Sequence, residues 1–589
     1  MRPSASSPTF SAADGAWTGA PAGGRPIRAL ADAETLLVAA LLVYVGGLAL
    51  WPMLRLFAEV LLVEGRDASS LLAEVWSGRA TLRALRNTIE AGLGATLVSL
   101  AIGTGTALLV GLTDVRAKPA IVFLLLLPLL IPPQITALAW LELMGPGSPI
   151  LGPLGLAPPP GTANPLYSAS GVILVMGVEH ATIVFLAVRA GLRALPRDLV
   201  EAARLAGASP LRVTATVLVP LLRPAILAGA ALAFVSSIGN FGVPALLGIP
   251  GRYPVLTTLI YQRLNGFGPS VLGEVAALAL ILAALAAIGL AARAAAAARG
   301  RTTGERTGAP VEPFRLGRAR PAAEAALWAL LLAVSVLPLL ALLATSLVPA
   351  LGVPIGPGTA TLDNFRFALF QQDAVRRAFA NSFVLAATAA AASAAVSVPL
   401  AYLTVFRRNR VARILDLVAD GPYAIPGIVL SIAAILVFLR PLPLLGVSLY
   451  GTAWIILAAY LARFLALALR PTLAGVEQID RGVEEAARMA GAGLFRRLFT
   501  IVLPLAAPSA AAGALLVFMT AFNELTVSAL LWSTGNETLG VMVFALHYEG
   551  NSPAAAAVAT VSIAVTLALA LAAGALGRRL PEGVVPWRA

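Results

Sequence analysis

Two stretches of this chain repeat one pattern, and that repeat decides how the rest of the sequence is interpreted. The first is "EAARLAGASPLRVTATVLVP", from Glu201 to Pro220, and the second is "EAARMAGAGLFRRLFTIVLP", from Glu485 to Pro504. Both contain Glu-Ala-Ala, three residues, Gly, nine residues, an aliphatic residue, one more residue, a second aliphatic residue and Pro. The copies lie 284 residues apart with no slippage between them, which indicates an internal duplication.

The composition places the chain in a lipid bilayer. Of its 589 residues, 59% are hydrophobic and 12% are charged, with a mean hydropathy of +0.88, whereas about a quarter of the residues in a soluble protein are charged. The net charge of +13 comes from Arg residues in short clusters between apolar runs. This pattern argues against a nucleic-acid partner and favours cationic loops that face an anionic inner leaflet.

Several kinds of chemistry are excluded because the residues they need are missing. The chain has no cysteine, and only His180 and His547 supply imidazole, so disulfides, thiolate metal sites, cysteine catalysis and His-rich metal cages are excluded. The single lysine, Lys118, stands between Ala117 and Pro119. A phosphate-binding loop needs its lysine after Gly and before Ser or Thr. If ATP hydrolysis drives this protein, the ATPase is therefore expected to be a separate polypeptide.

Apolar runs of about 20 to 25 residues predict twelve membrane-spanning helices. The run from Leu36 to Leu54 begins too late and is too long for a cleaved signal peptide, so we expect it to be the first span. The other expected spans lie near 88–113, 119–143, 169–192, 223–247 and 271–296, and near 323–348, 381–406, 411–439, 450–473, 507–533 and 554–578. We expect an all-α integral membrane protein with two tandem six-helix domains.

The expected domain boundaries follow from these runs and from two polar segments. They are a disordered cytoplasmic tail at 1–33, a first domain at 34–298 with its repeated loop at 193–222, an Arg-rich cytoplasmic linker at 299–322, a second domain at 323–580 with its repeated loop at 474–506, and a cytoplasmic tail at 581–589.

The two halves also match outside the repeated phrase. "RALRNT" at Arg83 matches "RAFANS" at Arg377, and Ile131-Pro132 matches Ile425-Pro426, both at a spacing of 294 residues. The spacing changes to 284 because the loop after the third span is longer in the first half. Each half has an even number of spans, so both halves enter the membrane from the same side.

Arginine placement predicts the orientation. The clusters near 116, 193–212, 299–320, 407–410, 496–497 and 578–579 all fall on one side of the expected membrane, whereas the opposite loops balance Arg with Glu and Asp. By the positive-inside rule, both termini and both copies of the repeated phrase are expected in the cytoplasm.

The repeated phrase is expected to form a helical hairpin that projects from the membrane. "EAARLAG" consists of good helix formers, and Gly207 is suited to the left-handed conformation that ends a helix. Ser209 then caps a second helix that has Pro210 at its first position. Gly491 and Gly493 are expected to make the corresponding turn in the second half. Such a hairpin is suited to dock in a groove of a partner.

The phrase resembles the signature of the permeases of binding-protein-dependent ABC importers, and two copies in one chain resemble the fused twelve-span permeases of ferric-iron and thiamine import. The resemblance implies two type I importer permease domains that contact two copies of an ABC ATPase subunit and a periplasmic binding protein. ATP and Mg would be bound by the ATPase, and the chain itself would hold no cofactor and catalyse no reaction. The contacts to the ATPase would be made by Glu201, Ala202, Ala203, Gly207, Glu485, Ala486, Ala487 and Gly491.

The transported molecule is predicted from weaker signals. "GNFGVPALLG" and "FNELTVSALL" resemble the region between the fifth and sixth spans of ferric-iron permeases more than that of sugar or amino-acid permeases. Ferric iron is therefore the expected substrate, and thiamine, phosphonate and polyamine are the alternatives.

Polar residues inside the expected spans are candidates for the translocation pathway, because such residues are costly in lipid and usually face a cavity or a partner. They are Glu179, His180, Asn240, Arg463, Asn523 and Glu524. Arg463 occupies the position that matches Glu179, so an ion pair between them across the two halves is predicted. Glu524 is open to two interpretations, an oxygen ligand for a cationic substrate or a cap on a helix end.

Two other classes of membrane protein remain as alternatives. A secondary transporter also uses twelve spans in two halves, but it has no use for matched docking hairpins. A membrane enzyme needs clustered catalytic groups, and the sequence shows no such constellation of His, Asp and Ser.

Overall fold

The structure is a computed structural model that describes residues 25–61, 68–195, 197–266, 271–300, 314–442 and 446–576. Within these residues the regular secondary structure is entirely helical. Ten of the described helices are long and apolar enough to cross a membrane, and two further bent pairs meet the same criterion when each pair is taken together. The prediction of an all-α membrane protein is confirmed.

The first half begins with a helix that starts earlier than expected. Its elements are α1 (Arg25–Val45), the π-helical turn η1 (Gly46–Leu50), α2 (Trp51–Leu61), α3 (Ala68–Ser77), α4 (Arg79–Leu112), α5 (Lys118–Leu130), α6 (Pro133–Met144), α7 (Ala169–Arg193), α8 (Arg197–Leu205), α9 (Pro210–Val213), η2 (Thr214–Leu218), α10 (Val219–Gly239), η3 (Pro244–Gly248), α11 (Leu256–Leu264) and α12 (Val271–Gly300). Strong helix formers such as Ala29, Leu30 and Ala31 extend α1 into the segment that was expected to be a tail. The rest of that expected tail, residues 1–24, lies outside the described residues.

The second half repeats this order. Its elements are η4 (Gly317–Ala319), α13 (Arg320–Leu331), η5 (Leu332–Val336), α14 (Leu337–Ser346), α15 (Asp363–Arg366), η6 (Phe367–Gln371), α16 (Asp373–Val405), α17 (Arg410–Ala419), α18 (Gly421–Ala424), α19 (Gly427–Phe438), α20 (Ala453–Glu477), α21 (Arg481–Met489), α22 (Leu494–Arg497), η7 (Leu498–Val502), α23 (Leu503–Phe522), α24 (Ser528–Leu531), α25 (Leu539–Tyr548) and α26 (Ser552–Leu576). Residues 301–313 of the expected linker and the expected tail at 581–589 lie outside the described residues.

The expected third span of each half is a sharply bent pair of helices instead of one straight helix. The chain turns by 106° between α5 and α6 and by 110° between Arg410–Ala424 and α19. Both turns fall at the matched Ile-Pro pairs, Ile131-Pro132 and Ile425-Pro426. Proline has no backbone N–H to donate, and it pushes the residue before it out of the helical region, so a helix ends there.

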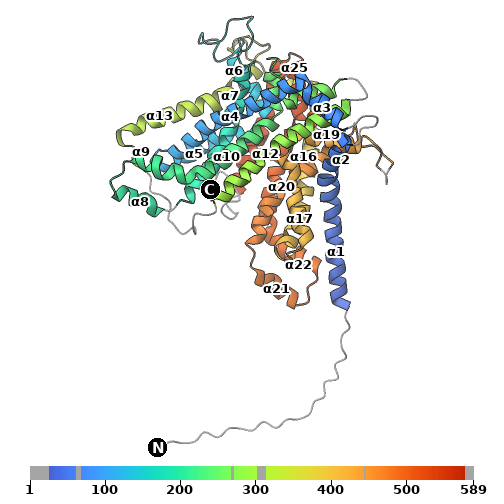
Figure 1. The fold of residues 1–589 in the computed structure, drawn as a ribbon. Coiled ribbons are helices and arrows are strands. Elements are labelled where there is room, and N and C mark those ends of the chain that lie inside the picture. Colours follow the sequence, from blue (N-terminus) through green and yellow to red (C-terminus); the bar gives the residue numbers. More distant parts are fainter. Residues whose placement is uncertain are drawn as a thin grey trace, which may run out of the picture.

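The first span of each half packs against the other half. Figure 1 shows α1 beside α17 and α22 of the second half, and α13 beside α5 of the first. Leu41 and Val45 of α1 share a buried cluster with Leu494 and Leu498 of the second hairpin. Leu327 and Leu331 of α13 share another with Val200 and Val213 of the first hairpin, and with Phe314. Each hairpin is therefore supported by a helix from the opposite half.

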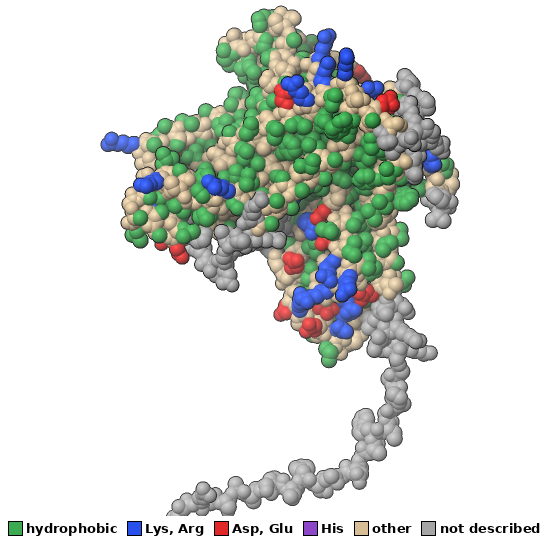
Figure 2. Space-filling model, viewed as in Figure 1, with side chains coloured by type: hydrophobic (Ala, Val, Ile, Leu, Met, Phe, Trp, Pro, Cys, Tyr) green, Lys and Arg blue, Asp and Glu red, His purple; other side chains and the backbone are tan. Residues whose placement is uncertain are grey.

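The two halves diverge toward the hairpins and meet at the opposite end. In Figure 1, α8 and α9 lie at the end of one arm and α21 and α22 at the end of the other. Figure 2 shows that the surface is hollowed between these arms and that charged side chains gather at the tip that carries α21. The broad flanks in that view are mainly hydrophobic, as expected for surfaces that face lipid.

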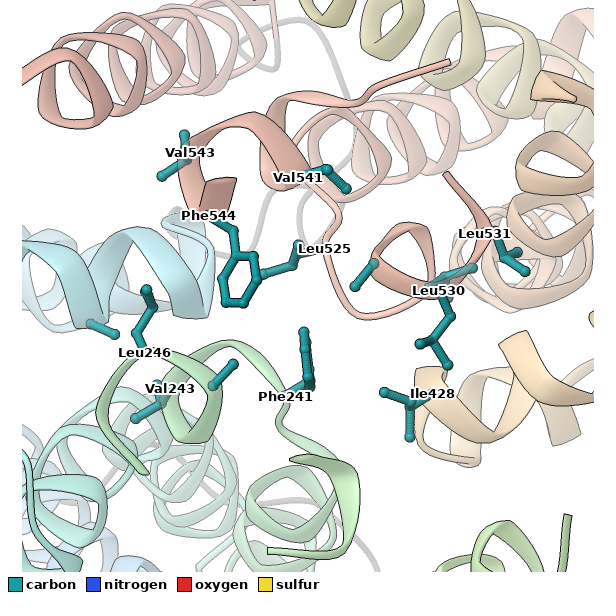
Figure 3. Packing of buried hydrophobic residues seen from close by; sticks show 14 of the residues in the cluster. Phe241, Val243, Leu246, Ile428, Leu525, Leu530, Leu531, Val541, Val543 and Phe544 are labelled. Atoms are coloured by element: carbon teal, nitrogen blue, oxygen red, sulfur yellow. The ribbon is translucent and has the colours of Figure 1, made fainter. Parts of the chain in front are cut away.

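At the opposite end, side chains of both halves close the structure. Phe241 and Tyr261 of the first half contact Phe544 of the second, with ring centroids 6.1 Å apart in each of these two pairs. Figure 3 shows Phe241 and Phe544 among other buried apolar residues of both halves. The Tyr548 hydroxyl also donates to the Ala245 carbonyl at 2.7 Å. We call Phe241, Tyr261, Phe544 and Tyr548 the closing cluster.

The matched segments "RALRNT" and "RAFANS" have the same structural task in both halves. Thr88 Oγ1 accepts a hydrogen bond from the backbone N–H of Leu256, the first residue of α11, at 2.8 Å. Ser382 Oγ accepts from Leu539, the first residue of α25, at 2.9 Å. A hydroxyl on the second span therefore caps the short helix that carries part of the closing cluster.

Replacing this cap provides a test of the fold. Ser382→Ala leaves the Leu539 N–H without its acceptor, and we expect a loss of about 1 kcal/mol of local stability. Hydrogen exchange of the first amides of α25 in the purified protein measures it. Ser382→Thr is the matched control, because Thr occupies the same position in the first half. Equal exchange in the Ala and Thr variants would contradict the capping role.

Candidate functional site

The first copy of the repeated phrase forms the predicted hairpin. Helix α8 ends at Leu205, and Gly207 follows in the left-handed region with φ of +78°. The Ser209 hydroxyl then accepts a hydrogen bond from the Arg212 N–H, and Pro210 is the first residue of α9. The predicted turn and cap are confirmed. Helix α9 continues through η2 into the long span α10 without a break, so the hairpin is joined rigidly to the membrane domain.

The second copy folds in the same way, with one difference. Gly491 has φ of +78°, the same value as Gly207. Gly493 stands at the position of Ser209 and precedes α22 with φ of −65°, so it completes the turn as expected but has no side chain to cap the helix. At the start of α21 the Asp480 carboxylate accepts from the Gly482 N–H at 2.8 Å.

The tips of the two hairpins expose apolar side chains at matched positions. Leu205 is 90% exposed, and Met489, 284 residues later, is 88% exposed. Two further exposed pairs have the same spacing, Leu199 with Val483 and Leu211 with Phe495. Large apolar side chains that extend from polar loops are typical of protein interfaces. Sequence reasoning missed these residues, although the hydrophobic positions were visible in the repeat. We call these six residues the hairpin tips.

The residues predicted to contact an ATPase lie on these hairpins. Ala202, Gly207, Glu485, Ala486 and Gly491 are exposed, whereas Glu201, Ala203 and Ala487 are partly buried. Their contact with a partner stays a prediction. Their placement beside the hairpin tips, on two short helices with a small-residue face, leaves room for the close approach of another chain.

The linker supports the first hairpin. The Arg204 guanidinium lies 4.4 Å from the ring centroid of Phe314, and the Phe314 N–H donates to the Leu112 carbonyl at 2.7 Å. Nearby, a hydrogen bond from the Leu316 N–H holds the pKa of Asp114 below its usual range. The start of the second half is thus fastened to the first half beside the hairpin.

Inside the membrane domain, the candidate pathway residues of the first half contact one another. The Asn240 amide donates to Glu179 Oε2 at 3.2 Å, and Asn240 Oδ1 accepts from the Val243 N–H at 3.1 Å. His180 Nδ1 lies 2.9 Å from the Ser237 hydroxyl. Asn240 therefore joins α7 to the break that follows α10, directly beside Phe241 of the closing cluster.

The second half uses different residue types at the same two positions. Arg463 matches Glu179, and Glu524 matches Asn240. The Arg463 guanidinium donates to the Ile425 carbonyl at 3.0 Å, and its charge interacts with the Glu524 carboxylate. Within the described residues Glu179 forms no ion pair with Arg463, so that prediction is wrong. Each residue bonds within its own half instead, Glu179 to the Asn240 amide and Arg463 to the Ile425 carbonyl.

Of the two interpretations of Glu524, the structure adopts the helix cap. Its carboxylate accepts from the Val527 N–H at 2.7 Å and from the Ser528 N–H at 3.1 Å. Asn523 is also engaged, since its amide contacts Thr566 and Ser562, and its carbonyl accepts from Gln134 of the first half. In the described part of the chain no three His, Asp or Glu side chains form a metal-ligating group.

These features define a class of protein: a multi-pass membrane permease built from two similar domains, each with a docking hairpin. The chain matches the model of the family "binding-protein-dependent transport system inner membrane component" over residues 98–302 and again over 387–582. It therefore belongs to this family of ABC transporter permeases, which are transport proteins and not enzymes.

Similar proteins support this assignment. A probable ABC transporter permease of Sinorhizobium fredii is 30% identical over 383 residues, which cover 63% of this chain and 66% of that protein. An Fe(3+)-transport system permease of Haemophilus influenzae is 24% identical over 469 residues, covering 78% and 83%. A probable molybdenum ABC transporter permease of Haloferax volcanii is 31% identical over 202 residues, covering 34% and 71%.

The left-handed glycine of the hairpin yields a prediction with an internal control. Gly491→Ala places a side chain at φ of +78°, where an L residue is strained by about 1 kcal/mol or more. An added Cβ meets no atom within 4 Å at Gly491 or at Gly493, so backbone strain alone distinguishes them. We expect faster hydrogen exchange in α21 for Gly491→Ala and no change for Gly493→Ala. The same response in both variants would rule out the turn as the cause.

Proposed function

We propose that this protein is the membrane permease of an ATP-driven importer and that each hairpin docks one ATPase subunit. The observation that carries the proposal is the matched exposure of the hairpin tips. A protein with one docking partner would not need a second set of exposed apolar residues at the matched positions, whereas two identical ATPase subunits need two similar docking surfaces. The chain cannot form the lysine-containing phosphate loop, so ATP and Mg are assigned to those subunits.

Glu201 and Glu485 are assigned to the same interface, together with the small residues that follow each of them. The small side chains of Ala202, Ala203, Ala486 and Ala487 allow close helix approach, and Gly207 and Gly491 set the angle of each hairpin. The two glutamates add charge at the edge of each apolar tip, where rim charges direct association more than they add affinity.

We further propose that the hairpins lie in the bacterial cytoplasm and that a periplasmic binding protein docks at the opposite end. The Arg clusters around both hairpins support this orientation by the positive-inside rule, and the name of the family supports the binding protein and the inner membrane. In this arrangement the arms are apart on the cytoplasmic side and the closing cluster blocks the periplasmic side. Closure of the ATPase pair would draw the hairpins together and separate the closing cluster.

Glu179, His180, Asn240, Arg463, Asn523 and Glu524 remain the proposed pathway residues. Asn240, Asn523 and Glu524 lie at the breaks next to Phe241 and Leu525. Glu179 bonds to Asn240, and the charge of Arg463 interacts with Glu524. These positions support a role where the closing cluster opens. Since most of their hydrogen-bonding groups are engaged by backbone or by each other, we propose that they hold these breaks in place for the passing substrate and do not form a fixed binding site.

Ferric iron is the proposed substrate. The support is the names of relatives that align with both halves, two ferric permeases of Haemophilus influenzae and one of Actinobacillus pleuropneumoniae, at 23–24% identity. Molybdenum permeases are about 30% identical, but over only about a third of this chain. Thiamine, phosphonate and polyamine, which a sequence of this type also allows, stay as alternatives.

The docking role predicts the effect of a charge on the tips. Leu205→Asp with Met489→Asp is expected to weaken binding of the ATPase subunit by at least about tenfold, because a buried unpaired charge is costly at an interface. Binding to the purified permease in detergent measures this effect. Leu156→Asp is the control, since Leu156 is also an exposed leucine, in the loop before α7. Unchanged binding in the double variant would remove the tips from the interface.

The substrate is tested by ATP hydrolysis in liposomes that contain the permease, the ATPase and a loaded binding protein. Stimulation by a ferric-loaded binding protein is expected, with no stimulation by binding proteins loaded with molybdate, thiamine, phosphonate or polyamine. Glu201→Arg with Glu485→Arg is expected to abolish it, because the substitutions reverse the charge at both contacts. If no ATPase subunit binds the chain, the importer fails as a proposal and a secondary transporter becomes the better explanation.

A further inference from the structure

The two hairpins have the same backbone conformation but are held in place by different side-chain interactions. We propose that Glu34, Tyr402, Arg407, Glu484 and Arg497 form a positioning network that fixes the second hairpin around a buried ion pair, at the place where the first hairpin has two valines. The proposal rests on the docking function of the hairpins, because the position of a hairpin affects transport only if a partner binds to it. The two ATPase contacts would then differ in rigidity.

The centre of the network is a buried ion pair within the second hairpin. Glu484 of α21 is 7% exposed and Arg497 of α22 is 2% exposed. Arg497 Nη1 lies 2.5 Å from Glu484 Oε1, and the Tyr402 hydroxyl donates to the same oxygen at 2.9 Å. Since α21 and α22 are the two helices on either side of the Gly491 turn, this pair ties the hairpin together and fastens it to α16.

A second ion pair connects this centre to the other half of the protein. Arg407 follows α16, and its guanidinium donates twice to Glu34 Oε2, at 2.7 and 3.0 Å. The Asn409 amide donates to the other oxygen of Glu34 at 3.1 Å. Glu34 lies on α1, the span of the first half that packs against the second half. The charges of Arg407 and Glu484 interact, as do those of Glu34 and Arg497, so two acids and two bases form one neutral group.

The matched positions of the first half are apolar or uncharged. Val200 and Val213 correspond to Glu484 and Arg497 at the spacing of 284, and both are fully buried in the same place between the hairpin helices. At the spacing of 294, Leu108 corresponds to Tyr402 and Thr113 to Arg407. The two helices of the first hairpin therefore meet through apolar side chains where those of the second meet through an ion pair. Around the first hairpin, Arg204 lies against Phe314, and α13 bonds to the loop after α4, where the Arg116 N–H donates to Glu324 at 2.9 Å and Arg320 lies 3.6 Å from Asp114.

The physical consequence concerns position more than total stability. A buried ion pair gains little over a well-packed apolar pair, but it must be complete, because one partner left alone is a buried unpaired charge. It is also directional, since the guanidinium and carboxylate have to meet in a fixed geometry. Two valines tolerate small shifts without such a penalty. The second hairpin is thus restricted to one position relative to α1 and α16, whereas the two helices of the first hairpin can shift slightly against each other.

The experiment uses hydrogen exchange of both hairpins in the full-length purified permease. Arg497→Val leaves Glu484 buried and unpaired, and we expect exchange in α21 and α22 to rise about tenfold or more. The double variant Glu484→Val with Arg497→Val places the two valines of the first hairpin in the second, and exchange is expected to fall most of the way back toward wild type. The remaining difference comes from the Tyr402 hydroxyl, which loses its acceptor. Arg496→Val, an exposed arginine next to Arg497, is the charge control and should change nothing.

Two milder variants keep the test valid if Arg497→Val does not fold. Tyr402→Phe removes one hydroxyl, and Glu34→Gln removes one charge from the other half. Both are expected to raise exchange in α21 and α22 about twofold to fivefold and to leave α8 and α9 unchanged. An increase confined to α1 in Glu34→Gln, or equal damage in the single and double valine variants, would overturn the network.

The functional arm measures ATP hydrolysed per substrate transported in liposomes. Arg497→Val is expected to raise that ratio severalfold, with restoration in the double valine variant, because a hairpin without a fixed position transmits ATPase closure poorly. An unchanged ratio in Arg497→Val overturns the positioning role. Hydrogen exchange is measured on the permease without the ATPase. If the ATPase does not bind the wild-type protein, the docking function is refuted, and the exchange result alone decides whether the network exists.

Discussion

The structure depends on the need to satisfy every backbone polar group inside a lipid bilayer. Helices meet this need by themselves, so each place where a helix breaks within the membrane domain requires a side chain to complete the hydrogen bonds. Asn240 and Glu524 accept backbone N–H groups after the fifth span of each half. Thr257 and Ser431 donate to carbonyls freed by the same breaks. These capped breaks leave non-helical backbone beside the closing cluster, where a transport protein has to open.

The first span of each half packs against the other half, and this arrangement makes the two halves one mechanical unit. Helix α1 packs on the second hairpin, and α13 packs on the first. A force applied to either hairpin therefore reaches both halves. It passes through the span that continues from the hairpin and through the first span of the opposite half. This arrangement suits a protein whose two arms have to move together.

Duplication preserved the geometry of the two halves and let their chemistry diverge. The left-handed glycines, the hydroxyl caps on α11 and α25, and the exposed hairpin tips are repeated. Several buried pairs are not repeated, because such a pair can be replaced by another complete pair at little cost, whereas half a pair cannot remain. Val200 with Val213 and Glu484 with Arg497 are two such solutions, and Glu179 with Asn240 and Arg463 with Glu524 are two more.

The sequence by itself determined the duplication, the helical membrane class, the hairpins and the turns at Gly207 and Gly491, because periodicity, hydrophobic length and glycine conformation are local properties. Tertiary structure decided which groups meet. The ion pair expected between Glu179 and Arg463 does not form, since each side chain bonds within its own half, Glu179 to Asn240 and Arg463 to the Ile425 carbonyl. The network from Glu34 to Arg497 also depends on how distant helices pack, whereas the bends at Ile131-Pro132 and Ile425-Pro426 have a local cause in the proline of each pair. The length of an apolar run does not show where the chain bends. The constant spacing between the two halves aligns their positions but does not show which side chains are neighbours.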